Sequence, residues 1–214
     1  MDPPSTSTAD RTWCEWGAAC PSRGTIPCNF GQVILDKNVP FFQQELIQIL
    51  GNEVSYLELS RMTGIDKETV ERYIILLERA FIVFRLGSFS RNLRKELSKS
   101  RKIYFYDNGI RNAVIRNYAP LELRTDTGAL WENFLISERL KFLQKNEWFS
   151  NRYFWRTHDR QEIDYIEERD GILHAFEFKW SEKTKSKFPN VFLRTYPEHK
   201  TDVINRSSFE MFVM

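Results

Sequence analysis

The chain has 214 residues, of which 42% are hydrophobic and 28% charged, and its formal net charge is +2. This apolar content is enough for a folded core, which argues against a disordered chain or a small disulfide-stabilised protein. Because no stretch approaches the roughly 20 apolar residues of a membrane span and the N-terminus lacks a secretory signal, we expect a soluble cytoplasmic protein with no membrane partner.

The first 35 residues differ in character from the rest of the chain. Residues 1–10 are rich in Pro, Ser and Thr, and all three cysteines follow at Cys14, Cys20 and Cys28. Their spacing does not fit a zinc site, which favours closely spaced cysteine pairs, and an odd number does not close into a disulfide framework. We predict that residues 1–35 form a poorly ordered arm with incidental thiols.

Helical signals follow this arm. Apolar residues recur at helical spacing over 41–50, and Ser55 begins a capping box with Glu58 three residues later. Gly64 is expected to end that second helix, and Asp66 to cap a third. Two short helices joined by a tight glycine turn indicate a helix-turn-helix.

Two predicted strands, over 81–86 and 102–106, enclose a basic segment with a single acid, Glu96. A helix-turn-helix followed by a ribbon with a basic tip is typical of a winged helix, and its basic segment is suited to phosphate contacts. The third predicted helix carries acids as well as bases, so a winged helix that serves only for packing stays open. The candidate nucleic-acid-binding residues are Arg91, Arg94, Lys95, Lys99, Arg101 and Lys102.

A domain boundary is predicted after residue 118, where a short helix over 110–115 leads to Pro120. This gives a winged-helix domain over 36–118 and a second domain over 119–214. The elements expected in the second domain are a helix over 128–144 and strands over 153–157, 162–167, 173–180 and 201–205, with a hairpin turn at Asp170-Gly171. The fold class is therefore α+β, a winged helix-turn-helix module followed by a small α/β domain.

Two of these strands contain charged residues at positions where the sheet can bring their side chains together. Strand alternation places Asp164 on the face opposite Ile163 and Tyr165, and it places Glu177 and Lys179 together on one face of the next strand. The hairpin between the two strands can bring Asp164 opposite this pair.

Two carboxylates on one sheet face form a hard-oxygen site suited to Mg²⁺ or Mn²⁺, and Glu132 on the long helix could add a third. Such an ion can activate water for phosphodiester hydrolysis, while a nearby lysine positions that water. An ordinary ion pair between Glu177 and Lys179 on a solvated face is the alternative.

The D-x12-E-x-K arrangement on a helix-plus-hairpin core resembles the PD-(D/E)XK nuclease superfamily. The resemblance implies a restriction-endonuclease-like domain with Asp164 and Glu177 as metal ligands and Lys179 as the catalytic lysine. It also implies Glu132 as the helix-borne catalytic acid and Gln161 as an accessory polar group.

A wider set of strings, among them GNEVSY at 51–56, GALWENF at 128–134 and QEID at 161–164, resembles the C-terminal region of bacterial and archaeal AAA+-type ATPases. That region is a winged helix followed by a nuclease-like domain of unknown function. The chain departs from the family in having no Gly-Lys dipeptide and hence no P-loop, so no ATPase activity is expected from it. It also has Asp159-Arg160 where the family has a turn glycine, a position that disfavours Arg if φ is positive.

These observations lead to two main hypotheses. In the first, the chain binds DNA and is a metal-dependent phosphodiesterase. In the second, it is a catalytically inactive interaction module that serves an ATPase in trans or another protein partner. A sequence-specific transcriptional regulator is a third reading, which would require a free recognition helix and a symmetric dimer.

Overall fold

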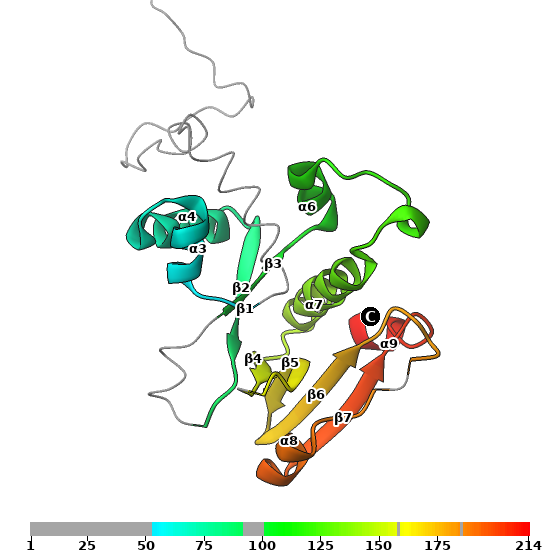
Figure 1. Ribbon diagram of the computed structural model, residues 1–214. Helices are drawn as coiled ribbons and strands as arrows, with labels where there is room; N and C mark the ends of the chain where they lie inside the picture. Colours follow the sequence, from blue (N-terminus) through cyan, green and yellow to red (C-terminus); the bar gives the residue numbers. More distant parts are fainter. Residues whose placement is uncertain (1–52, 92–100, 158, 185) are drawn as a thin grey trace, which may run out of the picture. The chain divides into compact units, whose positions relative to one another are not determined.

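The computed structural model describes residues 53–91, 101–157, 159–184 and 186–214 (Figure 1). The predicted arm, the predicted helix over 41–50 and all three cysteines lie outside these residues. Within them the strands form one seven-stranded mixed sheet in the order β1-β3-β2-β4-β5-β6-β7, so the predicted α+β class is confirmed. The strands are β1 (Glu53–Val54), β2 (Val83–Ser88), β3 (Arg101–Phe105), β4 (Asn151–Arg156), β5 (Glu162–Arg169), β6 (Ile172–Phe178) and β7 (His199–Ile204). The helices are α3 (Tyr56–Thr63), α4 (Lys67–Arg79), α6 (Asn108–Ile115), α7 (Thr127–Lys145), α8 (Asn190–Thr195) and α9 (Glu210–Val213), with a 3-10 turn over Leu121–Leu123.

The predicted caps of α3 and α4 are confirmed. The Ser55 side chain accepts a hydrogen bond from the Glu58 amide at 3.2 Å, and Asp66 accepts one from the Thr69 amide at 2.9 Å. Gly64 ends α3 with a φ of 69°, the left-handed conformation that glycine adopts without strain. These local bonds fix the two helices on either side of a tight turn.

An antiparallel pair, β2 and β3, follows the two helices, and the short β1 pairs with the other edge of β3. β2 begins two residues later than predicted because the chain turns after α4. Phe81 has a φ of 55°, and the Ile82 amide donates to the Leu77 carbonyl at 3.0 Å. Two short helices joined by a tight turn and followed by an antiparallel strand pair are therefore present, but the pair lies within the larger sheet and is not a free two-stranded ribbon.

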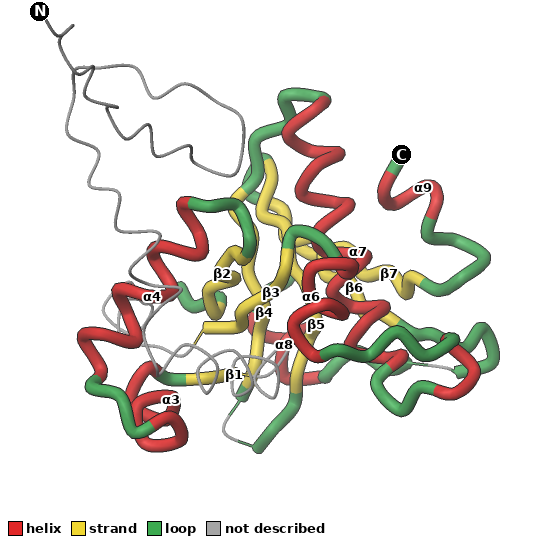
Figure 2. Tube along the Cα trace, turned by 90° about the horizontal axis from the view of Figure 1, so that it is seen from above, coloured by secondary structure: helices red, strands yellow, loops and turns green. Residues whose placement is uncertain are grey.

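β2 also pairs with β4, in parallel, through Gly87 with Tyr153 and Ser88 with Phe154. This pairing joins residues of the two predicted domains in a single sheet. Figures 1 and 2 both show α3 and α4 at the β1–β3 end of the sheet and β7 at the other end. Side chains from both halves of the chain can thus contribute to one site.

The predicted long helix, meander and last strand are confirmed as α7, β4-β5-β6 and β7, which runs parallel to β6. The short helices α8 and α9 were not predicted. Asp170 and Gly171 join β5 to β6 with φ values of 52° and 77°, so the predicted two-residue hairpin turn is confirmed. Across the described residues, no helix has the length and apolar character needed to cross a membrane.

Hydrophobic side chains cover both faces of this sheet, and neighbouring residues of one strand belong to different clusters. Phe154 packs in the cluster with α7 and α9, whereas Trp155 packs in the cluster with α8. Phe176 belongs to the first cluster and Ala175 to the second. The sheet is therefore a central layer with helices packed on both sides.

Candidate functional site

Asp164 lies in β5 at an irregularity of the sheet. The register between β4 and β5 shifts between Tyr153 and Trp155, so β5 has one residue more than β4 there. As a result Ile163 packs with α8 and Tyr165 packs with α7, and the prediction that both share the face opposite Asp164 is wrong. Asp164 Oδ2 accepts a hydrogen bond from the Phe178 amide at 2.8 Å, which fixes its carboxylate at the end of β6.

Glu177 and Lys179 lie at the same end of β6, on the face opposite Phe178. The Glu177 carboxylate is buried, with 7% of the residue exposed, and its Oε2 lies 2.9 Å from Lys179 Nζ. The Ser186 hydroxyl donates to the same oxygen at 3.2 Å. The Lys179 amide donates to the Ile204 carbonyl at 2.9 Å, so β7 holds the strand extension that carries the lysine.

Glu132 approaches from α7 and meets two residues of β3. Its Oε1 accepts a hydrogen bond from the Tyr104 hydroxyl at 2.6 Å and lies 3.1 Å from Lys102 Nζ. Lys102 also forms an ion pair with Glu162 of β5, and only 1% of the lysine is exposed. A cation from the first predicted domain is therefore buried between acids of the second.

The pKa shifts indicate that the acids of this site lie close enough for their charges to interact. Burial raises the pKa of Glu132, Asp164 and Glu177, and the charge of Asp164 raises that of the two glutamates further. Burial lowers the pKa of Lys102, but the charges of Glu132 and Glu162 outweigh it and raise the value to about 12. The lysine therefore remains charged and offsets part of the negative charge of the cluster.

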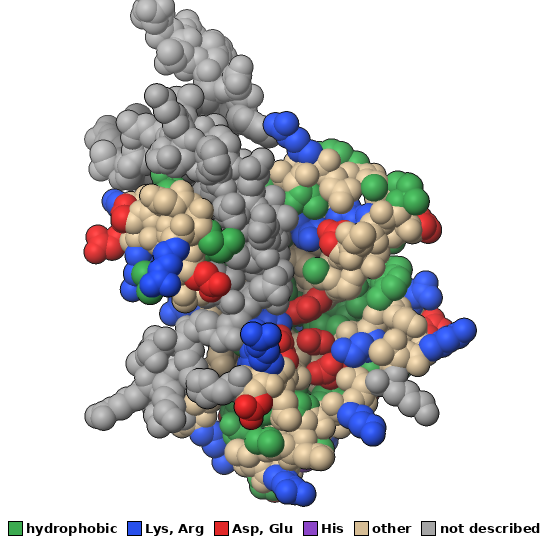
Figure 3. Space-filling model, viewed as in Figure 1, with side chains coloured by type: hydrophobic (Ala, Val, Ile, Leu, Met, Phe, Trp, Pro, Cys, Tyr) green, Lys and Arg blue, Asp and Glu red, His purple; other side chains and the backbone are tan. Residues whose placement is uncertain are grey.

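We call the set Lys102, Glu132, Asp164, Glu177 and Lys179 the acid–lysine cluster. In the described parts of the chain, no three His, Cys, Asp or Glu side chains are arranged as a ready-made metal cage. The side chains of Glu132 and Lys179 keep 19% and 28% of their surface exposed, so the cluster is reachable from solvent. Figure 3 shows acidic side chains gathered near the middle of one face, beside hydrophobic surface.

The remaining predicted site residues are more dispersed. Gln161 is exposed and closes the turn between β4 and β5 through its main chain, accepting from the Thr157 amide at 2.9 Å. Arg91 is exposed with its guanidinium 5.5 Å from the centre of the Tyr196 ring, and Arg101 is half-buried beside Tyr56. Arg94, Lys95 and Lys99 lie outside the described residues.

Lys102 was predicted as a surface phosphate contact, and its burial corrects that placement. Its ammonium is held by Glu132 and Glu162, so it is not presented to a ligand on the surface. Tyr104, which shares the Glu132 contact, was not singled out from the sequence at all. The signal was present, because residues 102 and 104 of one strand point to the same face.

Comparison with known proteins gives two family matches and two relatives. Residues 29–121 match a domain of unknown function (DUF8612), and residues 127–211 match another domain of unknown function (DUF4143). Uncharacterized proteins from Mycobacterium bovis and Mycobacterium tuberculosis are each 31% identical to the chain over 131 residues. That stretch is 60% of this chain but only 29% of each relative, so the relatives are far longer than the part they share. No solved structure matches the chain significantly.

Proposed function

We propose that the chain is a metal-dependent phosphodiesterase that acts on DNA, with a nuclease-like site of the PD-(D/E)XK type beside a winged-helix module. The observation that carries the proposal is the acid–lysine cluster. Asp164, Glu177 and Lys179 meet where β5 begins and β6 ends, and Glu132 adds a helix-borne acid.

The donor set fits a hard divalent cation such as Mg²⁺ or Mn²⁺. Asp164 uses Oδ2 and Glu177 uses Oε2 in the hydrogen bonds of the described residues, which leaves Oδ1 and Oε1 as candidate ligands. Three largely buried carboxylates whose pKa values are raised also favour the binding of positive charge, although Glu132 and Asp164 keep some contact with solvent. When bound, the ion would lower the pKa of a water molecule and stabilise charge on the phosphate.

The side chains of the chain itself would position the reactants. Lys179 retains its proton: burial lowers its pKa, but the hydrogen bond to Glu177 and the charges of Glu177 and Asp164 together outweigh burial and raise the pKa. A protonated lysine at this point orients water and attracts a phosphate oxygen rather than acting as a base at neutral pH. The Glu177–Ser186 hydrogen bond keeps the carboxylate oriented for this arrangement.

DNA binding by the winged helix is the second part of the proposal. The helix-turn-helix of α3 and α4 and the ribbon of β2 and β3 have the connectivity expected of that module. Arg91 is exposed where β2 leaves the sheet, and the basic segment 92–100 follows it in the sequence. Such a segment suits non-specific phosphate contacts, whose strength falls with salt.

Cleavage of plasmid and single-stranded DNA in Mg²⁺ or Mn²⁺ tests the enzyme. The variants Asp164→Asn and Lys179→Met should lower the rate by a factor of about 100 or more. Lys183→Met, an exposed lysine four residues beyond Lys179, should cleave at the parent rate. Equal background cleavage by the parent and all three variants would refute the enzyme claim.

A catalytically inactive interaction module is the second candidate, and the burial of Lys102 favours it. This lysine already supplies a counter-ion to Glu132 and Glu162 without any metal. The cluster would then stabilise the contact between α7 and β3 and leave ligand binding to other surfaces. Absence of Mn²⁺ binding by the parent chain in calorimetry, together with absence of cleavage, would support this candidate.

A further inference from the structure

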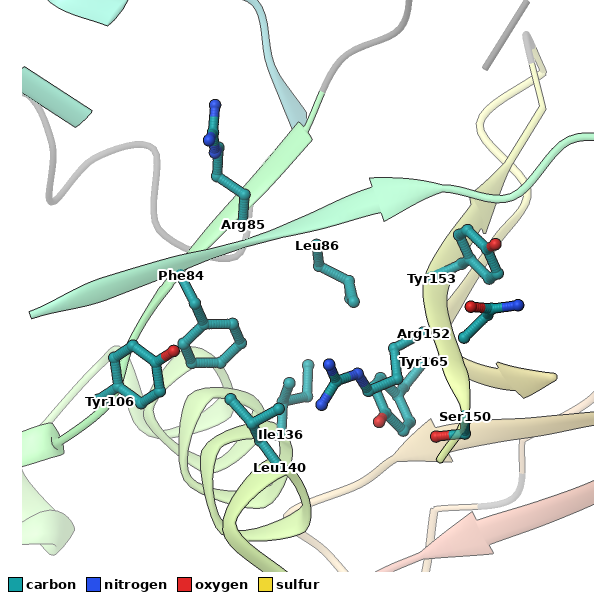
Figure 4. A pocket seen from close by; sticks show the side chains of 11 residues that line it. Phe84, Arg85, Leu86, Tyr106, Ile136, Leu140, Ser150, Arg152, Tyr153 and Tyr165 are labelled. Carbon is teal, nitrogen blue, oxygen red and sulfur yellow. The ribbon is translucent and has the colours of Figure 1, made fainter. Parts of the chain in front are cut away.

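A pocket of about 280 Å³ lies between the two halves of the sheet, away from every residue predicted to act in the site. It forms where β2 and β4 separate. Their pairing covers only Gly87 with Tyr153 and Ser88 with Phe154, so the upstream parts of both strands diverge. Ile136 and Leu140 of α7 contribute apolar side chains to the space left between the strands (Figure 4).

One cation points into this space. Figure 4 shows the Arg152 side chain extending into the pocket, whereas Arg85 points away from it. Arg85 is already neutralised by an ion pair with Glu78. Arg152 has no such ion pair among the residues that the structure describes, and Glu167, opposite it on β5, has both oxygens bound by Arg139.

Hydroxyl groups converge on the same space. The Ser150 and Tyr165 hydroxyls are buried, with 1% of Tyr165 exposed, and neither has a hydrogen-bond partner of ordinary geometry within the described residues. The acceptor nearest in effect to the Tyr165 hydroxyl is Glu167, whose two oxygens are already bound by Arg139. Burial raises the pKa of Tyr165 and Tyr106, and the charge of Glu167 raises that of Tyr165 further, whereas the nearby charge of Arg152 opposes the rise in both. Buried hydroxyls without a partner are costly unless a ligand or water satisfies them.

The opposite wall of the pocket is aromatic. Phe84 and Tyr106 pack with ring centroids 4.9 Å apart, and no Asp or Glu lines the pocket. The volume exceeds that of a bare inorganic anion and lies near the lower end of the range for small organic ligands. An aromatic wall together with a guanidinium suits a planar group that carries negative charge.

We propose that this pocket binds a small organic oxyanion, with the anionic group on Arg152 and the hydroxyls of Ser150 and Tyr165, and with a planar group against Phe84 and Tyr106. Phosphate and carboxylate share the required chemistry, because each presents two negatively charged oxygens that can accept hydrogen bonds from a guanidinium. The site is independent of the acid–lysine cluster, since the two have no residue in common.

Calorimetric titration of the full chain with phenyl phosphate and with benzoate tests the proposal and distinguishes the two anions. Benzyl alcohol and inorganic phosphate, which each lack one half of the ligand, should bind at least tenfold more weakly than the better of the two probes. Arg152→Gln should lower the affinity for that probe at least tenfold, and Tyr165→Phe should lower it a few-fold.

Arg194→Gln is the matched control, because Arg194 is an exposed arginine on α8 outside the pocket. Binding by this variant should equal that of the parent, and thermal unfolding checks that each variant is folded. The proposal is overturned if neither probe binds at millimolar concentration, if Arg152→Gln binds like the parent, or if Arg194→Gln loses as much affinity. Equal binding of inorganic phosphate would overturn the assignment of an organic ligand.

Discussion

The buried Lys102 of β3 and the partly buried Glu132 of α7 form an ion pair, with 3.1 Å between Nζ and Oε1. The pair connects the ribbon that follows the helix-turn-helix to the long helix of the second half. Because Lys102 also binds Glu162, its ammonium offsets two acids at once. The Lys102 side chain therefore contributes both to the stability of the fold and to the net charge of the candidate site.

Replacing this lysine should destabilise the fold strongly. In Lys102→Met, two partly buried carboxylates lose their cation, and breaking a buried pair by removing one partner costs about 3–5 kcal/mol. Urea unfolding of the variant and the parent measures the loss. Lys141→Met is the matched control, because Lys141 pairs with Glu138 while 47% exposed, and exposed pairs contribute at most about 1 kcal/mol. Similar small losses in both variants would contradict a structural role for Lys102.

The Lys102 contacts also show where prediction from the sequence ends. Local signals identified the caps at Ser55 and Asp66 and the turn at Asp170, because each depends on residues a few positions apart. The partners of Lys102 lie 30 and 60 residues away in the sequence. The sequence around Lys102 therefore contained no sign that this lysine is buried. Sequence reasoning could place Asp164 on its strand but not in its irregular register, which depends on the pairing with β4.

A second buried ion pair should behave differently when it is removed whole. Arg139 on α7 binds both oxygens of Glu167 on β5, at 2.6 and 3.0 Å, and donates to the Phe212 carbonyl at 2.6 Å. Arg139→Met alone should cost about 3–5 kcal/mol, since it leaves a fully buried carboxylate without its main partner.

The double variant Arg139→Met, Glu167→Leu should recover much of that loss, because apolar side chains of similar size avoid burying a charge. Denaturant unfolding of both single variants and the double variant forms a mutant cycle that gives the coupling energy. Losses that simply add, with no recovery in the double variant, would show that packing rather than charge dominates at this position.

Asp126 should make stability depend on acid. Its carboxylate binds Arg124 and Arg111 at 2.8 Å, and hydrogen bonding to Arg124 is the main cause that lowers its pKa below the ordinary value of 3.8. A lowered pKa means that the stabilisation is present above pH 3.8 and is lost as the pH falls below it. The stability difference between the parent and Asp126→Asn should therefore shrink as the pH is lowered from 5 to about 3. Urea unfolding at each pH measures it, and a difference that stays constant with pH would exclude this linkage.

The turn between β4 and β5 contains a strained arginine. Arg160 has a φ of 59°, in the left-handed region that favours glycine, and its amide donates to the Thr157 carbonyl at 3.1 Å. A side chain with a Cβ costs about 1–2 kcal/mol in this left-handed conformation, whereas glycine adopts it freely but loses more entropy on folding. We expect Arg160→Gly to stabilise the fold by about 0.5–1 kcal/mol.

Arg160→Ala separates the backbone effect from loss of the charged side chain. Alanine keeps the Cβ and hence the strain, so Arg160→Ala should unfold at nearly the same urea concentration as the parent. If both variants were stabilised equally, the arginine charge would be the cause and not the backbone conformation. Because this turn immediately precedes β5, a stabilised turn should also hold Asp164 in its register, and the cleavage rate of Arg160→Gly should not fall below that of the parent.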